Sequence, residues 1–132
     1  MQSRSSQKTL LVAEDEPVIA ELIQTILERA GYRVIVARNG QSALELIRRD
    51  QPAAAIVDVN MPLMDGFEVL SSLAANPPTS MPRTLVLTAR MALGDVEKAI
   101  ALGASDYLAK PFTDMTLLRR VGRLLGEGVR LN

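Results

Sequence analysis

The 132-residue chain contains no cysteine and no histidine, and these absences remove several kinds of chemistry before any motif is considered. Without cysteine there are no disulfide bonds and no thiolate metal sites. Without histidine there is no imidazole to act as a general acid or base, and no histidine-ligated zinc site. Any reaction at this protein must therefore use carboxylates, lysine, hydroxyl groups or a hard metal ion.

Aromatic side chains and net charge are also scarce. Aromatic residues make up 3% of the chain and hydrophobic residues 48%, so the core must be aliphatic. The 15 basic residues balance the 15 acidic ones, which gives no electrostatic reason to expect nucleic acid or an anionic membrane as a partner. No apolar segment approaches membrane-spanning length, and residues 1–8 lack the apolar stretch of a signal peptide. We expect a soluble, cytoplasmic protein.

Short apolar runs alternate with segments of helical periodicity along the chain. The runs predict strands at residues 10–13, 34–37, 53–57, 84–87 and 107–109. After the first run, Ile19, Leu22, Ile23 and Ile26 recur at three- and four-residue steps, which indicates an amphipathic helix. Five strands alternating with five helices predict an α/β fold with a parallel five-stranded sheet covered by helices on both faces. A doubly wound, flavodoxin-like (βα)5 unit in the order 2-1-3-4-5 has this arrangement and would place the binding crevice between the first and third strands.

Local signals predict where segments begin and end. Gly31 is expected to end the first helix, Asn39-Gly40 to form a turn, and Asp95 to cap the fourth helix. We expect one domain over residues 9–125, a flexible N-terminal tail over residues 1–8, and a C-terminal tail or linker stump over residues 126–132.

Polar side chains follow four of the predicted strands at the point where each strand ends. Glu14 and Asp15 follow the first strand, Asp58 the third, Thr88 the fourth and Lys110 the fifth. The carboxyl ends of parallel strands share one edge of the sheet, where ligands bind in open α/β folds. We therefore expect three carboxylates, a hydroxyl group and an ammonium group to converge there.

This set of groups suits one divalent cation and one phosphoryl group. Two carboxylates about 4 Å apart repel by roughly 4 kcal/mol at an effective dielectric constant near 20, so the cluster needs a proton or a cation. Oxygen ligands alone favour Mg²⁺ or Mn²⁺. An aspartate can attack phosphorus to form an acyl phosphate, while the cation, Lys110 and Thr88 neutralise the phosphoryl oxygens.

Each of these residues taken alone has an ordinary structural explanation. A single aspartate at a strand end usually caps a loop, and acids at residues 14–16 also suit the start of a helix. Thr88 alone would be a turn residue and Lys110 alone a solvated lysine, while Met61 and Met64 are interpreted as packing residues. The joint occurrence, in order, at four strand ends favours the phosphoryl-transfer site.

Four stretches of the sequence together resemble the receiver domain of response regulators, close to the chemotaxis-regulator type. They are residues 11–16, 57–66, 87–89 and 103–112, and the resemblance extends from about Thr9 to Leu125. It implies a phosphorylated signalling domain of a two-component system or phosphorelay. The implied donor is a sensor histidine kinase or a histidine phosphotransfer protein. The resemblance implies self-phosphorylation and self-dephosphorylation with Mg²⁺ but no separate enzymatic activity.

The resemblance also implies a role for each site residue. Asp58 is the implied phosphoacceptor, and Thr88 and Lys110 bind the phosphoryl group. The implied metal ligands are Asp15, Asp58, Asn60 through its backbone carbonyl, and Glu14 through water.

A switch between two states is implied as well. Tyr107 turns inward when Thr88 moves, and the Lys110-Pro111 peptide bond is cis. The switch acts on the face built from the fourth helix, fifth strand and fifth helix, which pairs with a second copy or a separate effector. Candidate contacts there are Arg119, Arg120 and Arg123, for which a solvated basic face is the alternative.

The resemblance further implies that Asn60 and Arg90, each two residues beyond a site residue, flank the water that hydrolyses the acyl phosphate. We expect Arg90 to obstruct this water and slow hydrolysis; the alternatives are that Arg90 points into solvent or speeds the reaction as an arginine finger does.

Three other functions remain open from the sequence. A flavodoxin-like cofactor-binding module would share the fold, but residues 14–17 offer acids and a proline where a phosphate cradle is needed. A receiver-like adaptor would bind partners without phosphorylation. A metal-dependent phosphatase would need a second acid at the position of Asn60.

Overall fold

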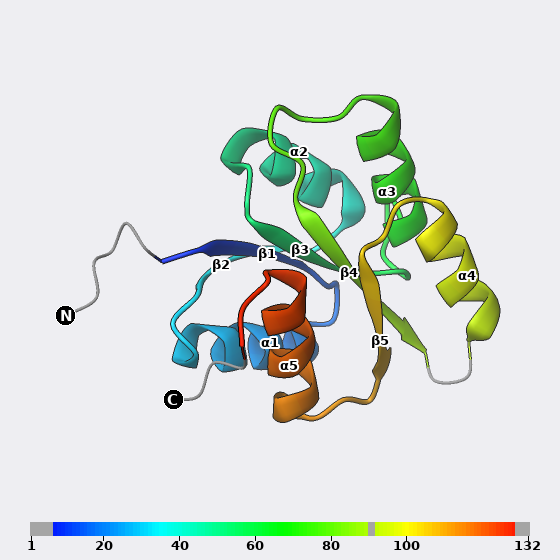
Figure 1. Ribbon diagram of the computed structural model, residues 1–132. Helices are drawn as coiled ribbons and strands as arrows, with labels where there is room; N and C mark the ends of the chain where they lie inside the picture. The colour runs from blue at the N-terminus through cyan, green and yellow to red at the C-terminus, as the bar shows by residue number, and fades with distance from the viewer. Residues whose placement is uncertain (1–6, 90–91, 129–132) are drawn as a thin grey trace.

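The computed structural model describes residues 7–89 and 92–128, and it shows one twisted sheet between two layers of helices (Figure 1). The strands are β1 (Thr9–Ala13), β2 (Arg33–Ala37), β3 (Ala54–Asp58), β4 (Arg83–Ala89) and β5 (Asp106–Lys110). The helices are α1 (Pro17–Arg29), α2 (Gly40–Asp50), α3 (Gly66–Ala75), α4 (Leu93–Ala101) and α5 (Asp114–Leu124). Neighbouring strands are parallel in the order β2-β1-β3-β4-β5, which confirms the predicted doubly wound, flavodoxin-like fold.

Helices α1 and α5 cover one face of the sheet, and α2, α3 and α4 cover the other (Figure 1). Successive side chains of a strand point to opposite faces. Leu10 and Val12 therefore join the core beneath α1 and α5, while Leu11 and Ala13 join the core beneath α2 and α3. A strand covered on both faces needs apolar residues at every position, and this explains why the predicted strands are continuous apolar runs.

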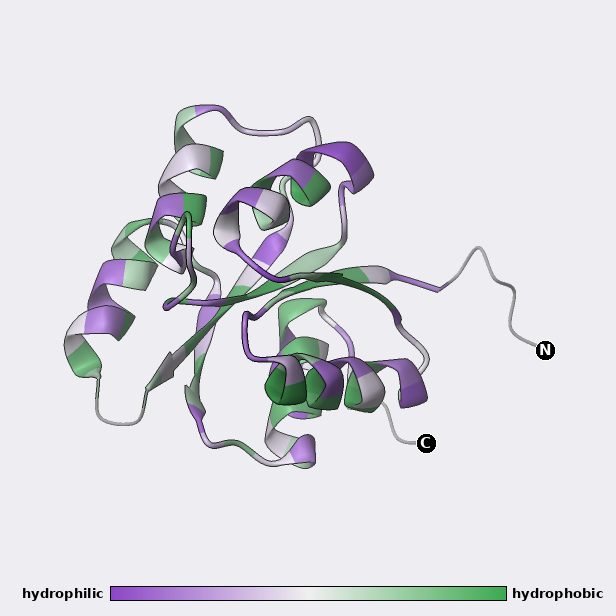
Figure 2. Cartoon of the chain, turned by 180° about the vertical axis from the view of Figure 1, so that it is seen from behind, coloured by the Kyte–Doolittle hydropathy of each residue, from purple (hydrophilic) through white to green (hydrophobic). Residues whose placement is uncertain are grey.

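Hydropathy follows the same layers (Figure 2). The sheet and the inner faces of the helices are largely hydrophobic, and the outer helix faces are largely hydrophilic. In α5 the buried leucine and valine side chains, Leu117, Val121 and Leu124, recur at steps of four and three residues. This spacing places them on the face that packs on the sheet. None of the helices in the described residues has both the length and the apolar character needed to span a bilayer.

Two of the three predicted local boundaries need correction. Gly31 adopts a φ of 96° just after the last residues of α1, as expected for a glycine that ends a helix. Asn39 and Gly40 do not form a separate turn, because Asn39 caps α2 by accepting a hydrogen bond of 2.8 Å from the Ser42 amide. The prediction for Asp95 is wrong: α4 already begins at Leu93, so this acid lies in its first turn, where it complements the helix dipole.

The two ends of the described chain meet at one place. The Lys8 ammonium lies 2.6 Å from a carboxylate oxygen of Glu127, and the Tyr32 hydroxyl donates to the other oxygen at 2.9 Å. Gln7 donates to the carbonyl of Gly31 at 3.2 Å. These contacts join residues of the two predicted tails to each other and to residues of the predicted domain. They do not test the domain boundaries at residues 8 and 126, which stay predictions.

The loop after β3 is held close to the strand end by one glycine. Gly66 is the first residue of α3, and its amide donates to the Val59 carbonyl at 3.0 Å. A Cβ atom added at Gly66 would lie 2.5 Å from the Asp58 carbonyl oxygen and 2.9 Å from the Val59 Cα atom. Both neighbours are backbone atoms, so neither can move away as a flexible side chain would.

Gly66→Ala should therefore lower the free energy of unfolding by about 1–3 kcal/mol, because the new methyl group overlaps backbone. The matched control is Gly94→Ala in α4, where an added Cβ meets nothing within 4 Å. There alanine should raise the free energy of unfolding by about 0.5–1 kcal/mol, because glycine is the poorer helix former. Denaturant unfolding of both variants measures the difference. Similar values for the two would show that the backbone gives way at Gly66.

Candidate functional site

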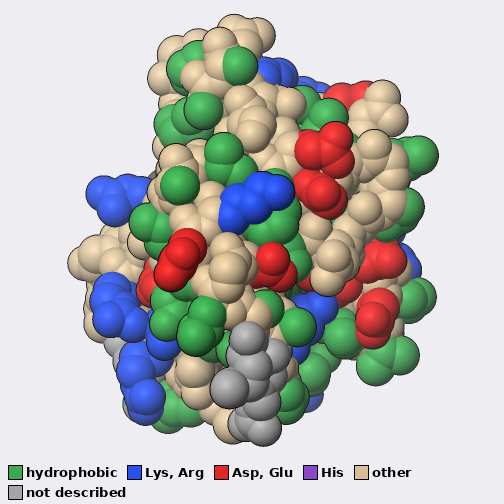
Figure 3. All heavy atoms as spheres, turned by 90° about the vertical axis from the view of Figure 1, so that its right-hand side faces the viewer, with side chains coloured by type: hydrophobic (Ala, Val, Ile, Leu, Met, Phe, Trp, Pro, Cys, Tyr) green, Lys and Arg blue, Asp and Glu red, His purple; other side chains and the backbone are tan. Residues whose placement is uncertain are grey.

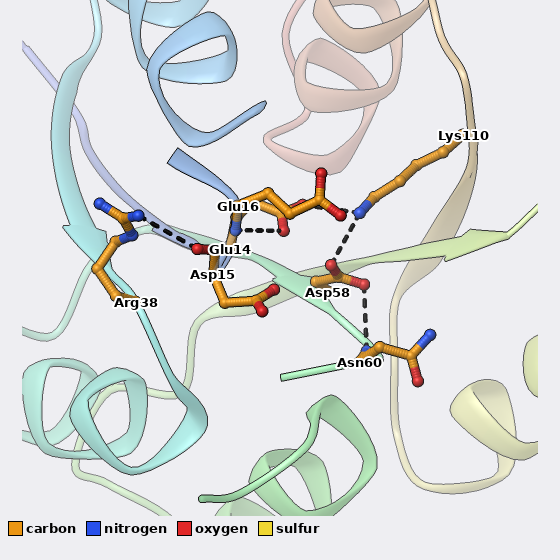
Figure 4. Close-up of polar contacts among 7 residues, drawn as sticks. All are labelled: Glu14, Asp15, Glu16, Arg38, Asp58, Asn60 and Lys110. Atoms are coloured by element: carbon orange, nitrogen blue, oxygen red, sulfur yellow. Dashed lines mark hydrogen bonds and ion pairs between the residues drawn. The ribbon is translucent and has the colours of Figure 1, made fainter. Parts of the chain in front are cut away.

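Three charged side chains meet at the carboxyl edge of the sheet. Asp58 is the last residue of β3, Lys110 is the last residue of β5, and Glu14 directly follows β1. In Figure 4 the Lys110 side chain reaches across from β5 toward the carboxylates that β1 and β3 bring to this edge. The crevice lies at β1 and β3, the pair at which the strand order reverses, as the sequence predicted.

The Lys110 ammonium binds both buried carboxylates. Its Nζ atom donates to Glu14 Oε1 at 2.8 Å and to Asp58 Oδ2 at 2.8 Å. Glu14 is 0% exposed and Asp58 is 4% exposed, so neither carboxylate is well solvated by water. Carboxylates in such surroundings require a cation or hydrogen-bond donors. Asp58 gains one more donor, the Asn60 amide at 3.2 Å from Oδ1.

Burial and mutual repulsion change the acidity of these groups. Burial raises the pKa of Glu14 from its ordinary value of 4.5 to about 7; the Lys110 hydrogen bond opposes this rise, and the Asp58 carboxylate adds to it. Burial alone would lower the pKa of Lys110, but its hydrogen bonds to Asp58 and Glu14 outweigh burial and raise it. Lys110 therefore stays protonated, while Glu14 titrates near neutral pH.

A divalent metal ion fits the charge and the donor atoms of this cluster. Glu14, Asp15 and Asp58 each offer a carboxylate oxygen, and these oxygens lie within 4.8 Å of one another. When ionised, the three acids carry −3, and Lys110 carries +1, which leaves −2. A divalent cation would neutralise this charge, and ligands that are all oxygen suit Mg²⁺ or Mn²⁺. The cluster could therefore hold such an ion.

Of the other predicted site residues, some line the cleft beside the cluster and some lie outside it. Asn60 lines the cleft with Asp15 and Asp58, and its side-chain amide points away from Asp58 in Figure 4. Thr88 is 1% exposed and directly precedes Ala89, which also lines the cleft. Tyr107 lies outside the cluster and is 37% exposed on the edge strand β5. The assigned roles of all these residues stay predictions.

Three further predictions concern residues around the site. The peptide bond between Lys110 and Pro111 is cis, as the resemblance implied. Met61 and Met64 pack against the core beneath α2 and α3, which confirms their interpretation as packing residues. Arg90 lies outside the described residues, so its expected place at the mouth of the site stays a prediction.

Sequence reasoning missed Arg38. Its guanidinium donates to the backbone carbonyl of Asp15 at 3.1 Å, and in Figure 4 it approaches Asp15 from the side opposite Lys110. The preceding residue, Ala37, accepts a hydrogen bond of 3.0 Å from the Glu14 amide. Arg38 directly follows β2, so applying the strand-end argument to the second strand as well would have found it.

The acid cluster opens into a cleft of about 480 Å³ with an apolar wall. The polar part includes Asp15, Glu16, Asp58, Asn60 and Lys110; the apolar part is formed by Ile19, Leu22, Ala89, Pro111 and Phe112. The apolar residues come mainly from α1 and from the loop after β5. A ligand in this cleft would therefore meet charged groups at one end and an apolar surface at the other.

Known proteins resemble this chain over most of its length. Residues 10–122 match the family of the response regulator receiver domain. The response regulator GtcR of Aneurinibacillus migulanus is 35% identical over 125 residues, which are 95% of this chain and 50% of that protein. The chain thus spans about half the length of such curated relatives.

Solved structures share the fold at lower sequence identity. The chemotaxis response regulator CheY4 of Vibrio cholerae superposes with a TM-score of 0.84 at 31% identity, covering 91% of this chain and 100% of that one. The receiver domain of the sensor histidine kinase PA1611 of Pseudomonas aeruginosa gives 0.83 at 31% identity, covering 92% and 100%. That structure holds a magnesium ion coordinated in its active-site cleft.

The raised pKa of Glu14 predicts how stability depends on pH in the metal-free protein. The folded state binds this proton more tightly than the unfolded state, so the stabilisation is complete below pH 4.5 and is lost as pH rises through about 7. Relative to Glu14→Gln, the wild type should therefore lose unfolding free energy over this range, by at most about 3 kcal/mol.

Denaturant unfolding between about pH 5 and pH 8, with a metal chelator present, measures this difference. Glu45→Gln, at an exposed position of α2, is the matched control and should keep a constant offset from the wild type. A constant offset for Glu14→Gln as well would contradict the raised pKa.

Proposed function

This chain belongs to the response regulator receiver domain family of two-component systems, and we propose that it accepts a phosphoryl group on Asp58. The proposed donor is a sensor histidine kinase or a histidine phosphotransfer protein. The observation that carries the proposal is the position of the Asp58 carboxylate at the end of β3. It lies 2.8 Å from the Lys110 ammonium and among two further acids, Glu14 and Asp15.

The proposed reaction transfers a phosphoryl group from nitrogen to oxygen. A carboxylate oxygen of Asp58 attacks phosphorus, and the bond between phosphorus and the donor imidazole breaks. The electron pair of that bond returns to the imidazole nitrogen, which takes up a proton. The product is an acyl phosphate on Asp58. Such a transfer depends on positioning and charge neutralisation more than on acid–base groups, so the absence of histidine from this chain is no obstacle.

Residues of the chain would neutralise the charge that arrives with the phosphoryl group. Lys110 already lies beside Asp58, and its ammonium can bind a phosphoryl oxygen as a point charge. Thr88 can donate its hydroxyl hydrogen to a second oxygen. Glu14, Asp15, Asp58 and the Asn60 carbonyl would hold the Mg²⁺ or Mn²⁺ ion, which, when bound, supplies a positive charge for the remaining oxygens.

We infer that the chain acts as a phosphorylated signalling domain rather than as an enzyme that turns over a separate substrate. It would phosphorylate itself from a small donor such as acetyl phosphate, and it would lose the phosphoryl group to water at the same site. A cytoplasmic location, in which a kinase could reach the site, stays the prediction made from the sequence.

The apolar wall of the cleft supports a protein as the donor. Leu22 of α1 is 47% exposed, and it lines both the cleft at Asp58 and a second groove that runs between α1 and α5. Met115 of α5 is 43% exposed and lines that groove as well. A helix carrying a phosphohistidine could pack on the apolar residues of the cleft and of the adjoining groove while its imidazole reaches Asp58. A small phosphodonor would not extend over this apolar surface.

The proposed output is a change in the face formed by α4, β5 and α5. Val86 is the register partner of Tyr107, and Thr88 lies two residues further along β4. Side chains two residues apart in a strand point to the same face, so Thr88 and Tyr107 lie on the same face of neighbouring strands. Movement of Thr88 toward a phosphoryl group would leave room for Tyr107 to turn inward. A second copy or a separate effector would read the altered face.

Asp58→Asn should abolish phosphorylation, because the amide cannot act as the attacking carboxylate. Intact-mass spectrometry after incubation with acetyl phosphate and Mg²⁺ should show one added phosphoryl group in the wild type and none in the variant. The matched control is Asp50→Asn, which makes the same chemical change at an exposed end of α2 and should leave phosphorylation intact. Undiminished labelling of Asp58→Asn would disprove the assignment, and an unlabelled wild type would favour the adaptor.

The same assay separates the two kinds of donor. Leu22→Asn, which adds polarity without a charge that would repel an anion, should slow transfer from a phosphohistidine protein but leave transfer from acetyl phosphate unchanged. Ile100→Asn in α4 is the control, since Ile100 is also 47% exposed but does not line the cleft. Equal slowing by both variants would argue against docking on α1.

Mg²⁺ should stabilise the protein by relieving repulsion among the three acids. At ten times the dissociation constant, one bound ion would raise the free energy of unfolding by about 1.4 kcal/mol. Asp15→Asn should lose most of this response, and without metal it should be no less stable than the wild type, because one repelling charge is gone. Thermal melts with MgCl2, and with NaCl at equal ionic strength, measure both effects. Equal shifts in the two proteins would place the ion elsewhere.

A further inference from the structure

We propose that Arg120 is a positioning residue that holds Tyr107 in its exposed orientation and thereby opposes the switch to the phosphorylated state. This inference rests on the proposed coupling between Thr88 and Tyr107. The sequence had suggested Arg120, with Arg119 and Arg123, as a contact for a partner. That suggestion stays a prediction, and in the structure Arg120 contacts residues of its own chain.

Arg120 contacts Tyr107 in two ways. Its guanidinium carbon lies 5.5 Å from the centre of the Tyr107 ring, which is the range of a cation–π interaction. Its Nη1 atom also donates a hydrogen bond to the Tyr107 backbone carbonyl. One side chain of α5 therefore binds both the ring and the backbone of the proposed switch residue.

Asp106 fixes the position of the Arg120 guanidinium. Its Oδ1 atom lies 3.2 Å from Arg120 Nη1 and also accepts the Tyr107 amide at 2.8 Å. Arg123 lies 3.8 Å from the other Asp106 oxygen. The Arg120 and Asp106 side chains are only 26% and 22% exposed, so this pair is partly shielded from water. Because this ion pair restricts the guanidinium, Arg120 is less able to follow the Tyr107 ring if the ring moves.

The contact is specific to one orientation of the ring. Tyr107 lies on the edge strand β5, where α5 can reach a ring turned outward. An inward ring would move toward Thr88 and the α4 side of the sheet, away from α5. Because Arg120 binds the outward ring alone, it shifts the population toward that orientation. Figure 3, which looks onto α4 and β5, shows basic side chains along its left margin. Among the described residues, Arg120 is the cation that lies over the Tyr107 ring, and the other cation–π contact joins Lys98 to Phe67.

Linkage then connects Arg120 to the affinity of the site for a phosphoryl group. If phosphorylation favours the inward ring, any interaction with the outward ring weakens phosphoryl binding by the same factor. Only the cation–π contact distinguishes the two ring orientations, and a partly exposed contact of this kind corresponds to about a two- to fivefold change in their ratio. Removing Arg120 should therefore raise the affinity of the site for a phosphoryl group by this factor, although Arg120 lies outside the cleft.

The two tyrosines of the chain make the ring orientation measurable. Ring-labelled [¹³C]tyrosine gives NMR signals from Tyr32 and Tyr107 only, and Tyr32→Phe assigns them. Beryllofluoride with Mg²⁺ serves as the acyl-phosphate mimic, and its bound ¹⁹F signal reports binding independently. In Arg120→Ala, the Tyr107 signal without beryllofluoride should move part of the way toward its bound position in the wild type. The half-saturating beryllofluoride concentration should fall about two- to fivefold.

Arg119→Ala is the matched control, since it removes the neighbouring arginine, which has no ion pair among the described residues. It should match the wild type in both readouts. Arg120→Lys keeps a positive charge beside Asp106 and should bring both readouts part of the way back to their wild-type values. Such partial rescue would show that the effect of Arg120→Ala does not come from general unfolding. An Arg120→Ala protein that behaves like Arg119→Ala in both readouts would overturn the inference. Beryllofluoride that binds without moving Tyr107 in the wild type would overturn the switch itself, and this inference with it, but not the assignment of Asp58.

Discussion

The whole site depends on one ammonium group placed between two carboxylates that have little access to water. Two such carboxylates about 4 Å apart repel by roughly 4 kcal/mol at an effective dielectric constant near 20, and each also loses hydration. Lys110 offsets part of both costs by donating to Glu14 and to Asp58. It cannot balance three acids, and the remaining negative charge makes the site attractive to a divalent cation. The same arrangement resists a bare anion until that cation is present.

The fold imposes this arrangement through its strands and loops. Parallel strands bring residues that are far apart in the sequence to a common edge, so Glu14 and Lys110 meet although 96 positions separate them. The loops then refine the geometry with backbone contacts, as where Gly66 packs against the strand end that carries Asp58. The edge that carries the site thus rests on a buried aliphatic core, while Tyr107 lies at the exposed periphery of the sheet.

The sequence predicts the architecture and the meeting of charges better than it predicts particular contacts. Apolar runs and helical periodicity reflect which residues are buried, and a sheet covered by helices on both faces imposes the same pattern of burial on any chain. Taking the strand order 2-1-3-4-5 then predicted that the acids after the first and third strands would meet. The start of α4 was misplaced because Asp95 suits a cap and a first turn equally well, and only packing decides between them.

Contacts between side chains on different elements were beyond reach of the sequence. Arg38 could have been found, since it too follows a strand. The engagement of Arg120 by Asp106 and Tyr107 could not, because an arginine on the exposed side of a helix reads as solvated until the neighbouring strand is placed beside it. The two ion pairs of Lys110, with Glu14 and with Asp58, were also beyond prediction. The sequence shows that these groups converge, but it does not show which carboxylate oxygens the ammonium binds.

The contact between Lys8 and Glu127, with Tyr32 beneath it, has a consequence for protein engineering. Because the chain enters and leaves the fold at neighbouring points, the domain has the geometry of a cassette. It could be inserted into a surface loop of a host protein without forcing the host's own ends apart, and its termini could be joined and reopened elsewhere by circular permutation. Both operations would leave the carboxyl edge of the sheet untouched.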